Sequence, residues 1–128
     1  MKKQAVSSDK APKALGPYSQ AVRCGDLLFL SGQVGIDPQT GKLAEGGVEA
    51  QARQVFKNMA AVLAAAGADF GSLLKTTVFL KDMSHFKTVN EIYAGHVPQP
   101  YPARSAVAVR DLPLGAEVEI EAIAVVDK

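Results

Sequence analysis

The chain has 128 residues, 48% of them hydrophobic, so it is close to the common size of one domain and can bury its own core. Fourteen Lys and Arg residues against thirteen Asp and Glu residues give a formal charge of +1, which disfavours a nucleic-acid partner, because such binding relies on many phosphate contacts. The single cysteine, Cys24, excludes an internal disulfide and is typical of a reducing compartment.

The N-terminal residues lack the apolar run of a signal peptide, and no stretch is long enough to span a membrane. We therefore expect one cytoplasmic domain, residues 1–128, with no membrane partner. In residues 21–37 two extended runs meet at Gly25-Asp26, which predicts a hairpin, and residues 37–42 supply the next turn. A 3.6-residue apolar period then predicts a helix that ends at Gly67, with a buried face of Val48, Ala52, Val55, Met59, Leu63 and Ala66.

A β-rich run over residues 73–82 follows this helix. Ser84 is the predicted N-cap of a second helix, which Gly95 and Pro98 stop. The apolar positions of that helix are Phe86, Val89, Ile92 and Tyr93. Residues 103–109 and 116–126 are the last two predicted strands.

Alternation in these last strands predicts which side chains share a face. In the final strand Glu117, Glu119 and Glu121 point away from the apolar face, which we expect to meet the helices. That apolar face consists of Val118, Ile120, Ala122, Ala124 and Val126. In the preceding strand Arg104 and Arg110 point away from the most apolar side.

An arginine in a short apolar strand is costly unless an anion meets its planar fork of donors. One interpretation is structural: Arg104 and Arg110 pair with the glutamates across the sheet, at ~0.2–1 kcal/mol per pair. If the two strands form a hairpin, Arg110 lies opposite Glu117, whereas Arg104 and Glu119 are offset by roughly 13 Å at ~3.3 Å per residue. Arg104 would then need a ligand carboxylate or an acidic group from another subunit.

Seven segments in order closely resemble the RidA/YjgF family of reactive-intermediate deaminases, which act on 2-iminobutanoate and 2-iminopropanoate. They are GPYSQAV, LFLSGQVGIDPQTGKL, QARQVFKNMAAVLAAAG, KTTVFLKDM, TVNEIYAGH, YPARSAVAV and VEIEAIAV. The resemblance implies a chorismate-mutase-like α+β domain, with a mixed sheet and two helices packed on one face. It also implies a homotrimer whose sheets form a central barrel and whose pockets lie at the subunit interfaces.

The implied activity is hydrolytic deamination of 2-imino or enamino acids to 2-keto acids and ammonia, with no metal or other cofactor. In the PARS motif Arg104 would bind the substrate carboxylate, and in the EIEA motif Glu119 would orient or deprotonate the attacking water. Tyr18 would close the pocket and assist catalysis. The remaining substrate-binding positions are Ser31, Gly32 and Asn90.

Each position also has a structural interpretation. Tyr18 can be a packing aromatic, Ser31-Gly32 a strand end, Asn90 a solvated helix residue and Glu119 one of three surface acids. Neither histidine has the spacing of a metal ligand, so both are expected to be structural or exposed, and Cys24 to be packed.

Two departures from the family pattern concern the pocket. Ala106 stands where many members carry a cysteine, and residues 96–100 replace an aromatic pair, which leaves the preferred imine side chain open. A non-catalytic regulator that binds small carboxylates, or a chaperone-like protein, would share the arginine. An RNA-cleaving translation inhibitor is disfavoured, because basic and aromatic residues are not interleaved.

Overall fold

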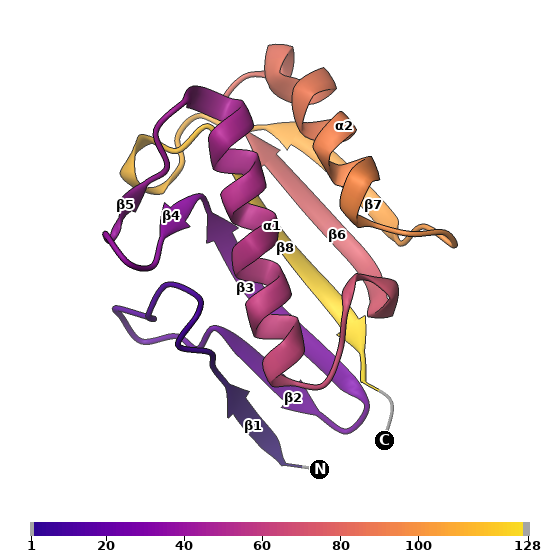
Figure 1. Ribbon diagram of the computed structural model, residues 1–128. Coiled ribbons are helices and arrows are strands. Elements are labelled where there is room, and N and C mark those ends of the chain that lie inside the picture. The colour runs from indigo at the N-terminus through magenta and orange to yellow at the C-terminus, as the bar shows by residue number, and fades with distance from the viewer. Residues whose placement is uncertain (1, 127–128) are drawn as a thin grey trace.

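Six strands form one sheet in the order β1-β2-β3-β8-β6-β7, and both helices lie over the same face of it (Figure 1). The computed structural model describes residues 2–126, so the predicted domain limits, 1 and 128, lie outside the described residues. The sheet strands are β1 (Lys3–Val6), β2 (Ala21–Cys24), β3 (Leu27–Val34), β6 (Leu73–Leu80), β7 (Ala103–Ala108) and β8 (Val118–Val125). A separate small hairpin pairs β4 (Ile36–Asp37) with β5 (Lys42–Leu43), and the helices are α1 (Gly47–Ala65) and α2 (Phe86–His96).

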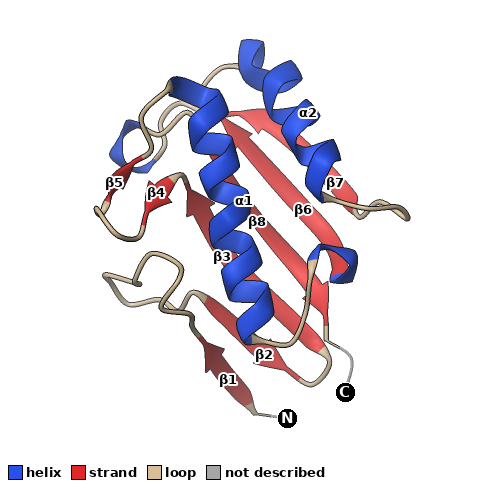
Figure 2. Cartoon of the chain, viewed as in Figure 1, coloured by secondary structure: helices blue, strands red, loops and turns tan. Residues whose placement is uncertain are grey.

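The predicted α+β class, with a mixed sheet and two helices on one face, is confirmed (Figure 2). The apolar period of α1 faces the sheet, where Val55, Met59 and Leu63 are almost fully buried. Gly67 follows the helix in the left-handed region, with φ +75°, as predicted for a C′ glycine. Among residues 2–126, neither helix combines the length and the hydropathy that crossing a lipid bilayer requires.

Strand β8 shows the predicted alternation of apolar and acidic side chains. Val118, Ile120 and Ala124 are fully buried under the helices, whereas Glu121 is exposed on the opposite face. The hairpin of β2 and β3 around Gly25-Asp26 is also confirmed. The sheet therefore has one face covered by α1 and α2 and one face that no helix within residues 2–126 covers (Figure 2).

The predicted hairpin between the last two strands is wrong. Strand β7 pairs in parallel with β6, while β8 lies between β3 and β6 and is antiparallel to both. The most apolar strand takes the central position, where both of its edges are paired and its core face is covered, and the more polar β7 takes the sheet edge. As a result, Arg110 does not lie opposite Glu117.

The predicted orientation of Arg104 is also wrong. Its neighbour on β6 is Thr76, and the neighbour of Thr76 on β8 is Ala122, both of which face the buried core. Arg104 therefore extends from the helix-covered side of the sheet, with Ala106 of the same side packed against the core. Alternation within one strand divides the side chains between the two faces of the sheet, but it does not predict which of these faces the helices cover.

The start of α2 differs from the prediction in its capping residue. Asp82, and not Ser84, caps the short 3-10 turn over Met83–His85, with its Oδ1 accepting from the Ser84 N–H at 2.8 Å. The helix then runs through Gly95 to His96. The short edge strand β1 was not expected, because its sequence KQAV is brief and mostly exposed.

Candidate active site

Arg104 is held against α2 by a hydrogen bond and by two aromatic rings. Its Nη1 donates to Oδ1 of Asn90 at 2.7 Å, and its Cζ lies 4.8 Å from the Tyr93 ring centroid and 5.4 Å from that of Phe86. Guanidinium groups are attracted to aromatic faces at such distances. Two predicted site residues, Arg104 and Asn90, are thus brought together at the edge of the sheet.

The guanidinium lies at an open hollow of about 440 Å³. The residues around it are Asn90, Tyr93, Ala94, Tyr101, Pro102 and Arg104. Within residues 2–126 the ion pairs are Arg53 with Glu49 and His85 with Glu117, so the described chain provides no carboxylate for Arg104. A permanent positive charge with spare donors therefore faces this hollow.

Ser31 and Gly32 form a β-bulge in β3. Leu30 pairs with Ala122 and Gln33 with Ile120, so Ser31 and Gly32 together stand opposite one residue of β8. The Ser31 hydroxyl donates to the Ser19 carbonyl at 2.6 Å, and its N–H donates to the Gln20 carbonyl at 3.0 Å. These bonds fix the segment that carries Tyr18 beside the bulge.

Gly32 leaves the space that the Glu119 carboxyl group occupies. A Cβ added at Gly32 would lie 2.8 Å from Cδ of Glu119 and would collide with its Oε2. The absence of a side chain at Gly32 therefore lets the Glu119 side chain take this position against β3. The Ser-Gly pair is therefore more than the end of a strand.

Four of the predicted residues line a second hollow of about 500 Å³: Tyr18, Ser31, Gly32 and Glu119. Apolar side chains supply much of the remaining wall, including Leu15 and Leu114, which are both largely exposed. Burial raises the pKa of Glu119 above its ordinary value, and the nearby charge of Glu121 raises it further. A raised pKa makes the carboxylate a better proton acceptor than a solvated one.

The two clusters do not meet within one chain. Glu119 lies three residues from Ala122, the β8 residue in line with Arg104, which corresponds to roughly 10 Å along the strand. Its side chain also projects from the helix-free face, since its neighbours Val118 and Ile120 face the core. Arg104 with Asn90, and Glu119 with Tyr18, Ser31 and Gly32, are therefore two separate half-sites on opposite faces.

The other acidic and basic candidates have local partners or lie elsewhere. Oε1 of Glu117 accepts a hydrogen bond from Nε2 of His85 at 2.7 Å. The predicted pairing of Arg110 with Glu117 is not among the ion pairs of residues 2–126. The His96 ring stacks on Phe56 with centroids 4.8 Å apart, and burial lowers its pKa. Among residues 2–126 no three His, Cys, Asp or Glu side chains are grouped so that they could hold a metal ion.

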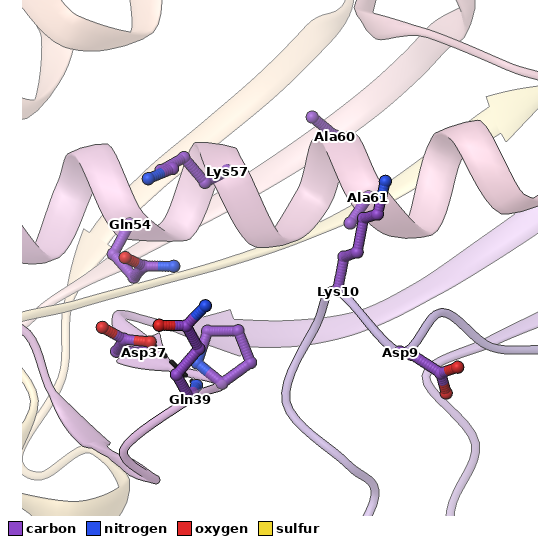
Figure 3. Close-up of a pocket in the computed structure, with 9 residues that line it drawn as sticks. Asp9, Lys10, Asp37, Gln39, Gln54, Lys57, Ala60 and Ala61 are labelled. Atoms are coloured by element: carbon purple, nitrogen blue, oxygen red, sulfur yellow. Dashed lines mark hydrogen bonds between the residues drawn. The ribbon is translucent and has the colours of Figure 1, made fainter.

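A further hollow of about 640 Å³ lies between the N-terminal loop, the β4 region and α1 (Figure 3). Asp37 uses its Oδ1 there to accept from the Gln39 N–H at 2.8 Å, and Lys10 extends along Ala61. The Lys57 and Asp9 side chains point away from one another in this view. None of the predicted site residues lines this hollow, and its charges do not converge on a common point.

Sequence reasoning missed three residues that shape the half-sites. Tyr93 was expected only as part of an apolar stripe, although it is three residues from Asn90 and therefore on the same side of α2. Gln20 is buried and holds the loop before Tyr18, with its Nε2 donating to the Pro12 carbonyl at 2.8 Å. Tyr101 walls the Arg104 hollow, and its position directly before the proline of the PARS segment was the available signal.

Comparison with known proteins settles the family. The family model described as Endoribonuclease L-PSP, which represents the RidA/YjgF proteins, matches residues 8–126. The chain belongs to the RidA/YjgF family. This RidA/YjgF chain is 56% identical to Reactive Intermediate Deaminase A, chloroplastic, of Arabidopsis thaliana over 97% of its own length and 66% of that protein.

The same RidA/YjgF chain is 52% identical to the 2-iminobutanoate/2-iminopropanoate deaminase of Mus musculus, over 96% of its own length and 91% of the mouse protein. Its fold matches the crystal structure of RidA from the Antarctic bacterium Psychrobacter sp. PAMC 21119 with a TM-score of 0.92 at 47% identity. That match covers 96% of this chain and 99% of the bacterial one. The resemblance found in the sequence is thus confirmed.

Proposed function

We propose that this protein hydrolyses 2-imino acids, 2-iminobutanoate and 2-iminopropanoate among them, to 2-keto acids and ammonia. The observation that carries the proposal is the presence of two complementary half-sites in a member of this family. One presents a guanidinium that lacks a carboxylate among the described residues, and the other presents a carboxyl group with a raised pKa. Relatives from Mus musculus and Homo sapiens, 52% and 49% identical to this chain, carry the name 2-iminobutanoate/2-iminopropanoate deaminase.

The complete site forms between subunits of a homotrimer. Strand alternation places Leu27, Phe29 and Val107 on the helix-free face of the sheet. All three are apolar, yet they are 41%, 44% and 44% exposed in the single chain. An apolar sheet face of this kind is typically covered by another protein surface, and cyclic symmetry would cover it three times. The three sheets then form a central barrel, and each Arg104 half-site faces the Glu119 half-site of a neighbour.

Arg104 provides the carboxylate-binding group. One of its N–H groups is already directed to Asn90, while the other donors remain available for the two oxygens of a substrate carboxylate. Binding at this end fixes the position of the imine carbon relative to the opposite half-site. Positioning of this kind supplies a large part of the acceleration when the substrate is already electrophilic.

Glu119 then acts on water. A water molecule adds to the imine carbon as its proton passes to the Glu119 carboxylate, which gives a tetrahedral amino alcohol. Glu119 then returns this proton to the nitrogen, the carbon–nitrogen bond breaks with its electron pair leaving on ammonia, and the hydroxyl proton passes to the Glu119 carboxylate as the carbonyl group of the 2-keto acid forms. Tyr18 closes this pocket and assists that transfer, while Ser31 and Gly32 hold the carboxyl group and the substrate in register.

The raised pKa of Glu119 makes this step depend on pH. Water activation needs the deprotonated carboxylate, so the rate should rise as the pH passes upward through the raised pKa. The free energy of unfolding should show the opposite trend. Glu119 binds its proton more tightly in the folded chain than in the unfolded chain, and this stabilising contribution is fully present below the ordinary carboxyl pKa. That contribution is lost as the pH rises through the raised pKa of the folded state.

The test is a coupled assay in which a dehydratase generates the imine and the release of keto acid is timed. Arg104→Ala should abolish the acceleration without dissociating the trimer, and Arg104→Lys should fail nearly as badly because the planar fork is lost. Glu119→Gln should still bind a 2-keto acid but turn over slowly, with a flat pH profile. Parent-like rates in both Arg104→Ala and Glu119→Gln would show that the assignment is wrong.

Matched controls lie on the same two strands or just beyond them. Arg110→Ala should retain the parent rate, because Arg110 is exposed and lies outside both hollows. Glu121→Gln should keep the plateau rate but move its rise to lower pH, since the Glu121 charge is the second cause of the raised Glu119 pKa. If Glu121→Gln lost as much rate as Glu119→Gln, the negative charge of this surface in general, and not the Glu119 carboxylate, would be responsible for the activity.

Two other functions fit part of this picture. The hollow at Arg104 would serve a non-catalytic regulator of small carboxylates equally well, and saturable keto-acid binding without any ammonia release would favour that role. The family model carries an endoribonuclease description, so RNA cleavage is assayed alongside. We place the protein in the cytoplasm on the basis of its single cysteine, although the Arabidopsis relative is named as chloroplastic.

A further inference from the structure

A buried hydroxyl pair lies directly beneath the Arg104 guanidinium. The Tyr93 hydroxyl and Oγ1 of Thr76 are 2.7 Å apart, and the two residues are only 5% and 1% exposed. Thr76 is also the neighbour of Arg104 in the pairing of β6 with β7. The hydrogen bond therefore ties α2 to the sheet at the strand position from which Arg104 extends.

This bond, together with core packing, fixes the plane of the Tyr93 ring. On its inner side the ring meets Phe56 edge-on, with centroids 5.9 Å apart and an angle of 86° between the planes. Its face is 4.8 Å from Cζ of Arg104. The ring thus has one face in use by the guanidinium and its polar end held by Thr76.

Three residues of α2 contact the guanidinium together. Phe86, Asn90 and Tyr93 follow one another at spacings of four and three residues, which places them on one stripe of the helix. An arginine side chain loses considerable rotamer freedom when it is held in one conformation. These contacts remove that freedom before any ligand binds, so the ligand does not have to supply the ordering free energy.

A purely structural role of Tyr93 would not require its ring to contact the Arg104 guanidinium. If the hydroxyl pair served only to satisfy itself in the core, Val and Phe at positions 76 and 93 would replace it at little cost, and the identity of the ring would not matter to Arg104. The position of the guanidinium over the ring face indicates a second role. We propose that the aromatic ring of Tyr93 is a positioning residue, which holds Arg104 in the orientation that binds the substrate carboxylate.

This inference rests on the proposed function, in which Arg104 binds that carboxylate. The test compares two double variants that differ only in the ring, Thr76→Val/Tyr93→Phe and Thr76→Val/Tyr93→Leu. Neither leaves an unpaired buried hydroxyl, so both are expected to fold. Phe86→Leu is a third variant, because Phe86 is only partly buried and also lies near the guanidinium.

Two measurements are made on each protein. The order of the Arg104 Nε–H group is measured by nitrogen-15 relaxation without ligand, and KM and kcat are measured in the coupled imine assay. We expect the Phe variant to stay close to the parent, because the edge-to-face packing against Phe56 still holds the ring without the Thr76 bond, and the Leu variant to show a mobile Arg104 and a KM raised about fivefold with a smaller change in kcat. Phe86→Leu should move both readouts in the same direction by less.

Equal Arg104 order in the Phe and Leu variants would overturn the inference, whatever their activity. Equal KM values in the two variants would overturn it as well, provided that the parent turns the imine over. If the parent releases no keto acid, the KM readout is replaced by the affinity for 2-oxobutanoate. A mobile Arg104 and weaker 2-oxobutanoate binding in the Leu variant alone would then support this inference while contradicting the proposed activity.

Discussion

At the scale of single residues, the contact between Gly32 and Glu119 links the backbone of β3 to the chemistry of β8. The glycine has no side chain, and the Glu119 carboxyl group fills the place where a Cβ would be. Burial of the carboxyl group, to which this close packing contributes, is the main cause of its raised pKa. Gly32, which has no reactive group, thus helps to set the position of the Glu119 carboxyl group.

Gly32→Ala should separate position from stability. The new Cβ meets mainly the flexible end of the Glu119 side chain, which can rotate away, so the free energy of unfolding should fall by only about 1 kcal/mol, at the low end of the range for overpacking. The displaced carboxylate should cost about 100-fold in kcat/KM, because small misplacements of catalytic groups are expensive. Steady-state kinetics and denaturant unfolding of the same preparation measure the two effects.

Gly95→Ala is the matched control. Nothing lies within 4 Å of a Cβ at this helical position, and its backbone is not in the left-handed region, so the variant should keep full activity. If Gly32→Ala keeps full activity as well, the placement of the Glu119 carboxyl group by Gly32 does not matter to the reaction.

Single residues also show what the sequence could and could not predict. Alternation correctly placed Glu119 opposite the buried side of β8, and the PARS motif predicted a role for Arg104, which lies at an open hollow. The hydrogen bond between Arg104 and Asn90 joins residues 14 positions apart, and no local pattern predicts such a contact. It depends on α2 crossing over β7, which is a property of the fold.

At the scale of elements, a buried amide on α1 holds the region where β3 ends. Asn58 is fully buried, and its Nδ2 donates to the Val34 carbonyl at 3.3 Å and to the Ile36 carbonyl at 2.9 Å. Its Oδ1 accepts from Nε2 of Gln54 at 2.9 Å. Val34 pairs with Glu119 across the sheet, so this amide supports the back of the Glu119 half-site.

Asn58→Ala should destabilise the protein strongly. It leaves two backbone carbonyl groups without their donor and opens a small cavity, so we expect a loss of about 2–4 kcal/mol in the free energy of unfolding. Denaturant unfolding at matched protein concentration measures this loss. Gln54→Ala, which removes one partly exposed hydrogen bond, should cost less than about 1 kcal/mol, and equal losses in both variants would contradict the role given to Asn58.

The elements differ in how well local sequence predicts them. The period of α1 and its terminal glycine are local signals, and both were correct. The partner of β7 was predicted wrongly, because alternation gives faces but not neighbours, and the 11-residue helix α2 allows a parallel crossover from β6 to β7. The capping of the turn before α2 was misassigned by two residues, from Asp82 to Ser84, since both residue types are good caps.

At the scale of the whole molecule, the proposed active site is shared between subunits. The two half-sites lie on opposite faces of one sheet, so no side-chain movement within a chain brings Arg104 to Glu119. The helix-free face, with its exposed Phe29 and Val107, is the surface on which a second and third copy would pack. The sequence alone could suggest this assembly only through the family resemblance, because the offset argued from a hairpin used the wrong strand pairing.

The most direct test is complementation between two impaired variants, Arg104→Ala and Glu119→Gln, produced together in one cell and purified as mixed trimers through different tags. Arg104→Ala alone should be inactive, and Glu119→Gln alone should turn over only slowly. In each mixed trimer, one of the three sites should combine an intact Arg104 from one subunit with an intact Glu119 from its neighbour, so about a third of the parent activity should return. Mixed trimers no more active than either variant alone would contradict the shared site and the account built on it.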